Sequence, residues 1–229
     1  MRKIILLVVV LAPVFWIGHK GVRSMAYVKE ATLLESPVKR ESSIPAGPIV
    51  AETLIQQPVM LNPELIRSLQ ESGPKDLLLL GVNMATYARH DNHGEILLGI
   101  VQGDVRIQTT LAVESIMDNA LLTVDFPAEK GRKLIGGEAM LFIKGVDSPA
   151  NKAVTAWLTS DTPFGGVWMN GKRRERGLVV ELCTLTYSPK AMLPALGLTI
   201  TMTFSLLIAA WMLTGSPENQ KRLEADGGS

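Results

Sequence analysis

Hydrophobic and polar residues alternate with a period of two over much of the stretch from residue 48 to residue 187. Alternation of this kind is typical of β-strands that bury one face. Clusters of Gly, Pro, Asp and Asn separate the alternating runs and predict turns between them. The expected strands cover residues 48–57, 76–89, 95–113, 120–126, 138–146, 151–160, 165–170 and 178–187, with Gly103 and Asp104 dividing the third run into a hairpin.

About eight or nine short strands with almost no helix predict an all-β fold, an antiparallel β-sandwich over residues 48–187. One short helix is expected at residues 62–73, where Asn62 can cap it, Pro63 suits the first helical position and Gly73 ends it. Roughly 130 residues are enough to bury a hydrophobic core without help from another chain.

Two continuous apolar segments lie outside this alternating region. The first, residues 4–18, follows Arg2 and Lys3 and has a length between that of a signal-peptide core and that of a short membrane anchor. The second, residues 191–215, contains no charged residue and is long enough to cross a bilayer as a helix. Its hydroxyl side chains can bond back to the backbone of a simple anchor or form a contact face for another helix; they are Thr199, Thr201, Thr203 and Ser205.

The two apolar segments predict a membrane-anchored protein with one exported domain between the anchors. A charged start followed by an apolar core is an export signal, so both termini are expected inside and the middle of the chain outside. We expect the first segment to be retained as a signal-anchor, with cleavage near "RSMA" at 23–26 as the alternative. The expected parts are a signal-anchor (1–18), a linker (19–47), an extracytoplasmic β-sandwich domain (48–187), a transmembrane helix (191–215) and a cytoplasmic tail (216–229).

The charge of the chain excludes one class of partner. It has 23 Lys plus Arg against 22 Asp plus Glu, a net charge of +1. A nucleic-acid binder needs a clear basic excess for its phosphate contacts, so no nucleic-acid partner is expected. The single cysteine, Cys183, lies in an apolar alternating run and is expected to be a buried, unreactive thiol.

Catalytic motifs are missing from the sequence. There is no G-x-S-x-G elbow, no H-E-x-x-H, no P-loop and no G-x-G-x-x-G. His90 and His93 lie close together, but the third histidine is His19, so a tetrahedral zinc site lacks ligands. We read residues 90–94 as a turn between two strands, with Gly94 at positive φ and Arg89 pairing with Glu95 across a hairpin. No metal, cofactor or catalytic residue is expected.

Two loops carry the candidate binding residues. Asp118 and Asn119 precede a strand, where short polar side chains commonly satisfy their own backbone, or could contact a sugar or calcium ion from a sandwich loop. The stretch "NGKRRERG" (170–177) is either a solvated hairpin or a contact for an anionic group, through Lys172, Arg173, Arg174 and Arg176. Trp168, beside glycines, is a plausible exposed stacking platform, whereas Trp157 is expected in the core.

Four stretches resemble a known module: "LLLLGVNMATYARHDNHGEILLGIV", "VESIMDNALLTVDFP", "GEAMLFIKGVDSPANKAVTAWLTSD" and "GGVWMNGK". They are similar to a jelly-roll or galactose-binding-like β-sandwich that accompanies bacterial cell-surface polysaccharide machinery, fused to or near membrane glycosyltransferases. The resemblance covers about residues 50–187 and carries over no catalytic residue.

The two apolar segments, together with the resemblance, imply a location in the bacterial inner membrane, with most of the chain in the periplasm. The resemblance further implies a non-catalytic accessory or binding component of cell-envelope polysaccharide biosynthesis or export. The expected partners are the lipid bilayer and either a polysaccharide or glycosyltransferase and export proteins. The alternative from another class is a structural subunit or assembly factor of a membrane protein complex. An envelope hydrolase is the third, because a carboxylate pair needs only spatial proximity.

Overall fold

The computed structural model describes residues 26–35, 42–193, 197, 200–206 and 208. The chain forms two compact units, Lys29–Tyr187 and a second made of Met1–Val28 with Ser188–Ser229. Each unit is described by itself.

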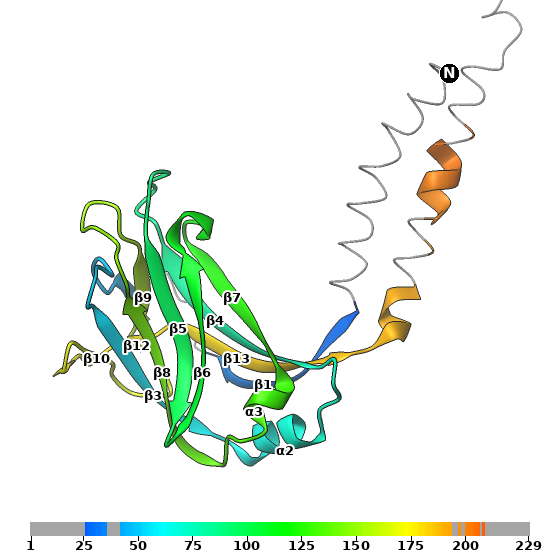
Figure 1. The fold of residues 1–229 in the computed structure, drawn as a ribbon, viewed down its shortest axis with the longest axis horizontal. Coiled ribbons are helices and arrows are strands. Elements are labelled where there is room, and N and C mark those ends of the chain that lie inside the picture. Colours follow the sequence, from blue (N-terminus) through cyan, green and yellow to red (C-terminus); the bar gives the residue numbers. More distant parts are fainter. Residues whose placement is uncertain (1–25, 36–41, 194–196, 198–199, 207, 209–229) are drawn as a thin grey trace, which may run out of the picture. The chain divides into compact units, whose positions relative to one another are not determined.

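The larger unit is an all-β fold of two antiparallel sheets, which confirms the expected sandwich (Figure 1). The seven-stranded sheet contains β1 (Tyr27–Glu35), β2 (Ser43–Pro45), β4 (Leu77–Ala85), β7 (Ala120–Pro127), β9 (Thr155–Thr159), β12 (Gly177–Leu178) and β13 (Val180–Tyr187). The six-stranded sheet has the order β11 (Lys172–Arg173), β10 (Trp168–Met169), β3 (Leu54–Leu61), β8 (Gly137–Gly145), β5 (Glu95–Gln102) and β6 (Val105–Ala112).

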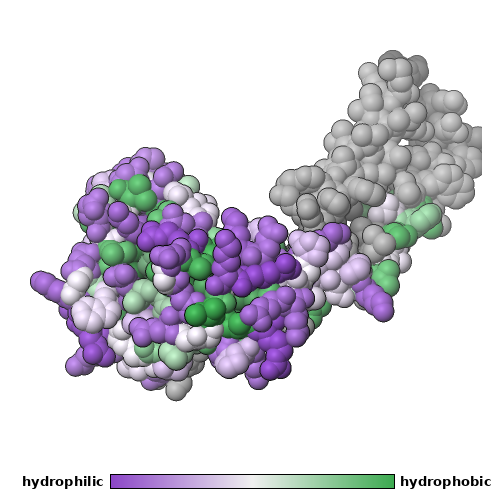
Figure 2. Space-filling model, turned by 60° about the horizontal axis from the view of Figure 1, so that its bottom comes forward, coloured by the Kyte–Doolittle hydropathy of each residue, from purple (hydrophilic) through white to green (hydrophobic). Residues whose placement is uncertain are grey.

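The core lies between the sheets because alternate residues of each strand point inward. In β4 these are Leu78, Leu80, Val82 and Met84, all at most 1% exposed. They face apolar side chains of the other sheet in one cluster of buried residues that includes Ile55, Val59, Ile96, Leu98, Ile100, Leu141 and Ile143. On the outside, hydrophilic residues are interspersed with small apolar patches (Figure 2).

The predicted helix is present as α2 (Pro63–Glu71). Asn62 caps it, because its Oδ1 accepts a hydrogen bond from the amide of Leu65 at 2.7 Å, and Pro63 occupies the first turn. The larger unit also contains η2 (Val113–Ser115) and α3 (Ala128–Gly131).

Two predicted hairpins are confirmed. Gly103 and Asp104 join β5 to β6, with Gly103 at φ 55°. Asn170 and Gly171 join β10 to β11, at φ 48° and 77°, which suits a two-residue hairpin turn with both central residues left-handed.

The predicted hairpin at residues 90–94 is wrong. β4 belongs to the seven-stranded sheet and β5 to the six-stranded sheet, so this segment crosses between sheets. Its local composition predicts a turn but says nothing about which sheet each flanking strand joins. Gly94 has the expected positive φ, 108°, whereas Arg89 bonds to backbone carbonyls and the amide of Glu95 donates to Asp147.

Strand boundaries differ from expectation near the start of the domain. Residues 48–53 form no strand, and β3 begins at Leu54. Conversely, β1 and β2 form within residues 19–47, the expected linker. Pairing along the sides of β13 and β9 supplies backbone hydrogen bonds that a weakly periodic sequence does not reveal.

The second unit contains η3 (Pro189–Met192) and helical residues at 200–206. The hydroxyl of Thr201 donates to the carbonyl of Gly197 and that of Ser205 to Thr201, both at 2.9 Å, as expected for back-bonding within a helix. The apolar segment 4–18 lies outside the described residues, and 191–215 lies only partly within them. In the described part of the chain, no helix is both long and apolar enough to span a membrane.

Candidate functional site

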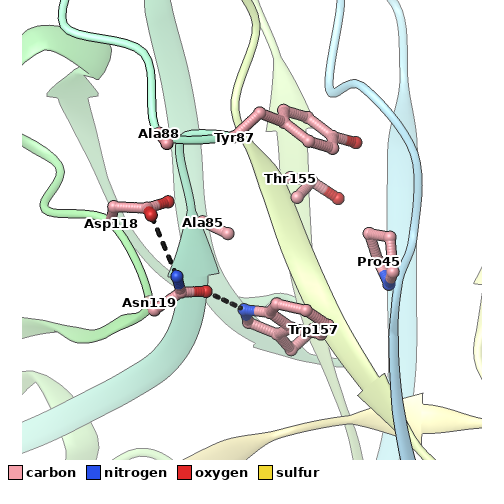
Figure 3. A pocket seen from close by; sticks show the side chains of 8 residues that line it. All are labelled: Pro45, Ala85, Tyr87, Ala88, Asp118, Asn119, Thr155 and Trp157. Carbon is pink, nitrogen blue, oxygen red and sulfur yellow. Dashed lines mark hydrogen bonds between the residues drawn. The ribbon is translucent and has the colours of Figure 1, made fainter.

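A pocket of about 250 Å³ opens beside one end of the seven-stranded sheet (Figure 3). It is bounded by the segment that follows β4, the loop that precedes β7, and the neighbouring strands β2 and β9. The residues that line it are Pro45, Ala85, Tyr87, Ala88, Asp118, Asn119, Thr155 and Trp157.

Trp157 reaches this pocket because of the alternation of β9. Ala156 and Leu158 are buried in the core, so Trp157 between them points to the opposite face. Its indole Nε1 donates a hydrogen bond to Oδ1 of Asn119 at 3.2 Å (Figure 3). The expected core position of Trp157 is therefore wrong, and its half-buried ring forms one wall of the pocket.

Three residues in two turns at the pocket hold left-handed backbone, and none of them is glycine. Tyr87 and Ala88 have φ values of 57° and 56°, and Asn119 has 52°. This conformation costs about 1–2 kcal/mol for a residue such as tyrosine or alanine. Backbone strain of this type concentrates at functional sites, where the surrounding structure maintains it.

Asp118 maintains the turn at Tyr87. Its Oδ1 accepts a hydrogen bond from the amide of Thr86 at 2.6 Å, and its Oδ2 accepts one from the Asn119 side chain at 2.9 Å. The backbone amide of Thr86 lowers the pKa of Asp118 below its ordinary value, with a smaller contribution from the amide of Ala88. The ionised carboxylate of Asp118 thus bonds both to Thr86, which is distant in sequence, and to the adjacent Asn119.

Arg89 fixes the other side of this turn. Its guanidinium lies over the ring of Tyr87, 4.9 Å from the ring centre. Nε donates to the carbonyl of Thr86 at 3.2 Å, and the terminal nitrogens donate to the carbonyls of Asn151 and Ala153. Asp118 at Thr86 and Arg89 at the ring therefore fix the turn, while Tyr87 stays 41% exposed.

The arrangement suits binding better than acid–base chemistry. Tyr87, Trp157 and Pro45 present flat apolar surfaces, and Asp118 adds carboxylate oxygens beside them (Figure 3), whereas Thr155 is fully buried and its hydroxyl is bonded to backbone groups of Gly47 and Ala156. A glycosidase requires a pair of carboxyl groups, one of which has a raised pKa to act as acid. Asp118 is the one carboxylate among the residues lining this pocket, and its pKa is lowered.

The other expected binding residues lie on a different sheet. Trp168, 40% exposed, pairs with Arg173 across the β10–β11 hairpin. Lys172, Arg173 and Arg174 are exposed, whereas Arg176 is half-buried and donates to the carbonyl of Ser42. Asp118 and Asn119 are brought together with each other, but none of the hairpin residues lines their pocket.

The two histidines of the connecting segment behave differently from each other. His90 is exposed, while Nδ1 of His93 pairs with the carboxylate of Glu114. A hydrogen bond from its own backbone lowers the pKa of Glu114, and the His93 side chain lowers it further. In the described residues, no group of three or more His, Cys, Asp or Glu side chains could hold a metal ion.

Sequence reasoning missed Tyr87 and Trp157 as pocket residues. A usable signal was present for Trp157, because the alternation around it places Ala156 and Leu158 on the core side. The sequence carries no such signal for Tyr87, because its exposure depends on the segment after β4 crossing from one sheet to the other. Comparison with known proteins gives no assignment: no protein family and no curated protein matches the chain.

Proposed function

We propose that this protein is a membrane-anchored, non-catalytic, glycan-binding component of the bacterial cell envelope. The observation that carries the proposal is the pocket in which Tyr87 and Trp157 stand beside the polar groups of Asp118 and Asn119. The resemblance to the jelly-roll or galactose-binding-like module supports the same reading.

The pocket matches the chemistry of a sugar ring. A pyranose has apolar C–H faces, which pack against aromatic rings, and an edge of hydroxyls, which bond to carboxylate, amide and hydroxyl oxygens. The volume of about 250 Å³ suits one such ring. The walls are held in place before binding, by Asp118 at Thr86 and by Arg89 at Tyr87, so little conformational entropy is lost when a ligand enters.

Membrane attachment is supported by the second unit. Alternate side chains of its helical residues are apolar and exposed: Ile200, Met202, Phe204 and Leu206 are between 41% and 62% exposed. Large apolar side chains that are exposed along a helix in this way are typical of a helix in a lipid environment. With residues 1–18 as a retained signal-anchor, residues 29–187 stand in the periplasm and the protein serves polysaccharide biosynthesis or export.

The test is saccharide binding by the full chain purified in mild detergent. The probe is the purified surface polysaccharide of the source cell, partly hydrolysed to oligosaccharides, with calorimetry as the measurement. Trp157→Ala and Tyr87→Ala should each weaken binding about tenfold or more, corresponding to about 1.4 kcal/mol. Trp168→Ala is the matched control, because it removes a similarly exposed aromatic ring from the hairpin and should change nothing.

Each outcome decides between sites. Loss of binding in Trp168→Ala with full binding in Trp157→Ala would move the site to the arginine-rich hairpin. Absence of binding by the unaltered chain would reject glycan recognition altogether.

The exposed apolar helix also favours the second candidate, a subunit or assembly factor of a membrane complex. Exchange of residues 191–215 for an unrelated transmembrane helix separates the two readings. An anchor should tolerate the exchange, and a normal surface-glycan profile of the cell would show this. Loss of the profile, with the domain still folded and saccharide still bound, would favour the complex subunit.

A further inference from the structure

A second pocket, of about 440 Å³, adjoins the first. It lies between the segment after β4 and the loop that contains η2. Ala88 and Asp118 line both pockets, so they stand on the boundary between the two.

The second pocket has a buried side-chain oxygen without a hydrogen-bond partner among the described residues. Asn92 is only 4% exposed, and its Nδ2 donates to the carbonyls of Thr86 at 3.3 Å and Arg89 at 3.4 Å. Its Oδ1 is buried and accepts no hydrogen bond from the described residues. Because buried acceptors in folded proteins are almost always satisfied, this oxygen is an acceptor of the second pocket that the fold leaves unsatisfied.

Two further side chains of the second pocket are carboxylate acceptors. Glu114 and Asp118 contribute carboxylates, and hydrogen bonds lower the pKa of both, so they are ionised at neutral pH. Two nitrogen-bearing side chains also line this pocket: Arg89, whose guanidinium nitrogens already donate to three backbone carbonyls, and the exposed His90. With two carboxylates in its wall, the pocket therefore fits a ligand that supplies hydroxyl donors better than one that carries its own carboxylate or phosphate.

An apolar surface completes the second pocket. Met117 is 72% exposed at its rim, which is unusual for a large apolar side chain on a polar loop. A flexible thioether side chain can pack against an apolar ring face of variable shape. The second pocket thus combines hydrogen-bond acceptors with an apolar side chain at its rim, as the first pocket combines a carboxylate with aromatic rings.

We propose that the two pockets are consecutive subsites for one saccharide of at least two units, with a neutral, hydroxyl-rich unit in the second. This inference rests on the proposed glycan-binding function and adds the ligand's minimum length and charge. Asn92 Oδ1 and Glu114 accept hydroxyl hydrogen bonds in the second subsite, and Asp118 stands between the units. Trp157 and Tyr87 hold the unit in the first subsite.

The experiment uses the full chain in detergent and an array of defined saccharides of one, two and three units, each in a neutral and a uronic-acid form. A neutral disaccharide of the preferred sugar should bind about tenfold or more tightly than its monosaccharide, which corresponds to one further set of contacts. The uronic-acid form of the second unit should bind about tenfold more weakly than the neutral form.

Variants of the second pocket locate the effect. Glu114→Gln exchanges an acceptor for a donor on an exposed side chain, and Met117→Ala removes the apolar rim, so neither threatens the core. Each should reduce the preference for the disaccharide to about threefold or less and leave monosaccharide affinity unchanged. Asn92→Ala should reduce the preference likewise, but because it also removes the hydrogen bonds to the carbonyls of Thr86 and Arg89 beside Tyr87, its monosaccharide affinity should fall as well. Glu138→Gln, an exposed glutamate of β8, is the matched control and should retain the full preference.

The results separate this inference from the function on which it rests. Equal affinity for monosaccharide and disaccharide rejects the second subsite while the first stands, and tighter binding of the uronic-acid form rejects the charge argument. If no saccharide of any length binds, the proposed function fails together with the inference. Should Asn92→Ala fail to fold by circular dichroism, Glu114→Gln and Met117→Ala decide the question.

Discussion

The indole of Trp157 in β9 is joined to the side chain of Asn119, the residue before β7, by a hydrogen bond of 3.2 Å. Both strands pair with β4 near its end, at Met84. The bond therefore crosses the outer face of the sheet above β4 and connects a strand residue to a loop. It orients the indole ring that forms one wall of the first pocket.

Replacement of Asn119 should separate this bond from the backbone strain at the same residue. Asn119→Gly keeps the positive φ of 52° but loses the hydrogen bonds to Trp157 and Asp118, and should cost about 1–2 kcal/mol of unfolding free energy. Asn119→Ala loses the same bonds and adds left-handed strain of about 1 kcal/mol. Urea denaturation should rank the free energies as Asn, then Gly, then Ala; equal values for Gly and Ala would contradict the strained turn.

The carboxylate of Asp118 should make stability depend on pH. Its pKa in the folded chain lies below the ordinary value of 3.8, so the folded state binds the proton less readily than the unfolded state. The contribution is fully present above the unfolded pKa and is lost as the pH falls through the lower, folded pKa. In Asp118→Asn, the melting temperature should therefore fall less steeply as the pH is lowered. Asp125→Asn, an exposed aspartate of β7, is the control, and an equal effect there would remove the special role of Asp118.

The β-sandwich could be predicted because its strands bury one face. In β4, Leu78, Leu80, Val82 and Met84 alternate with residues of the outer face, and this local pattern is visible in the sequence. The strand β1 was not predictable in the same way, because its place depends on pairing with β13, far along the chain. Pairing of distant segments leaves little trace in local periodicity.

The candidate site could be predicted only in part, for the same reason. Asp118 and Asn119 were nominated from their position before a strand, and both line the pocket. Tyr87 was missed because the segment after β4 crosses to the other sheet, which turns the ring to the surface. Asn92 was missed because an unpartnered oxygen is a property of the packed structure and has no sequence signal.

Gln57 joins the two sheets, and its replacement should weaken the whole fold. This fully buried residue of β3 accepts a hydrogen bond from the amide of Leu178 in β12 at 2.9 Å and donates to the carbonyl of Pro58 at 3.0 Å. Gln57→Leu should cost about 1–3 kcal/mol of unfolding free energy, because buried hydrogen bonds are lost. Gln108→Leu, at an exposed position of β6, should cost much less. Urea denaturation of both variants measures the difference in unfolding free energy.

Gly166 should be intolerant of any side chain. A Cβ there would lie 1.8 Å from the carbonyl oxygen of Arg174, so the arginine-rich hairpin would have to move. Gly166→Ala should cost about 1–3 kcal/mol, the usual range for overpacking. At Gly136 the nearest atom would be 3.9 Å away and φ is not positive, so Gly136→Ala should be neutral or slightly stabilising. An unchanged melting temperature of Gly166→Ala would contradict this prediction, because it would show that the arginine-rich hairpin moves aside at no cost in stability.

Cys183 should resist thiol reagents as long as the chain is folded. The side chain is 1% exposed, and burial raises its pKa to about 11, with the nearby charge of Glu181 adding to the effect. At about pH 8 almost no reactive thiolate is present, and reagent cannot reach the sulfur without local opening. The rate of colour development with an aromatic disulfide reagent should therefore be at least about a hundredfold lower in buffer than in concentrated urea. Cys183→Ala should abolish labelling in both conditions. Rapid labelling of the native chain would mean that β13 opens readily and that the sheet next to β4 is less stable than its buried contacts indicate.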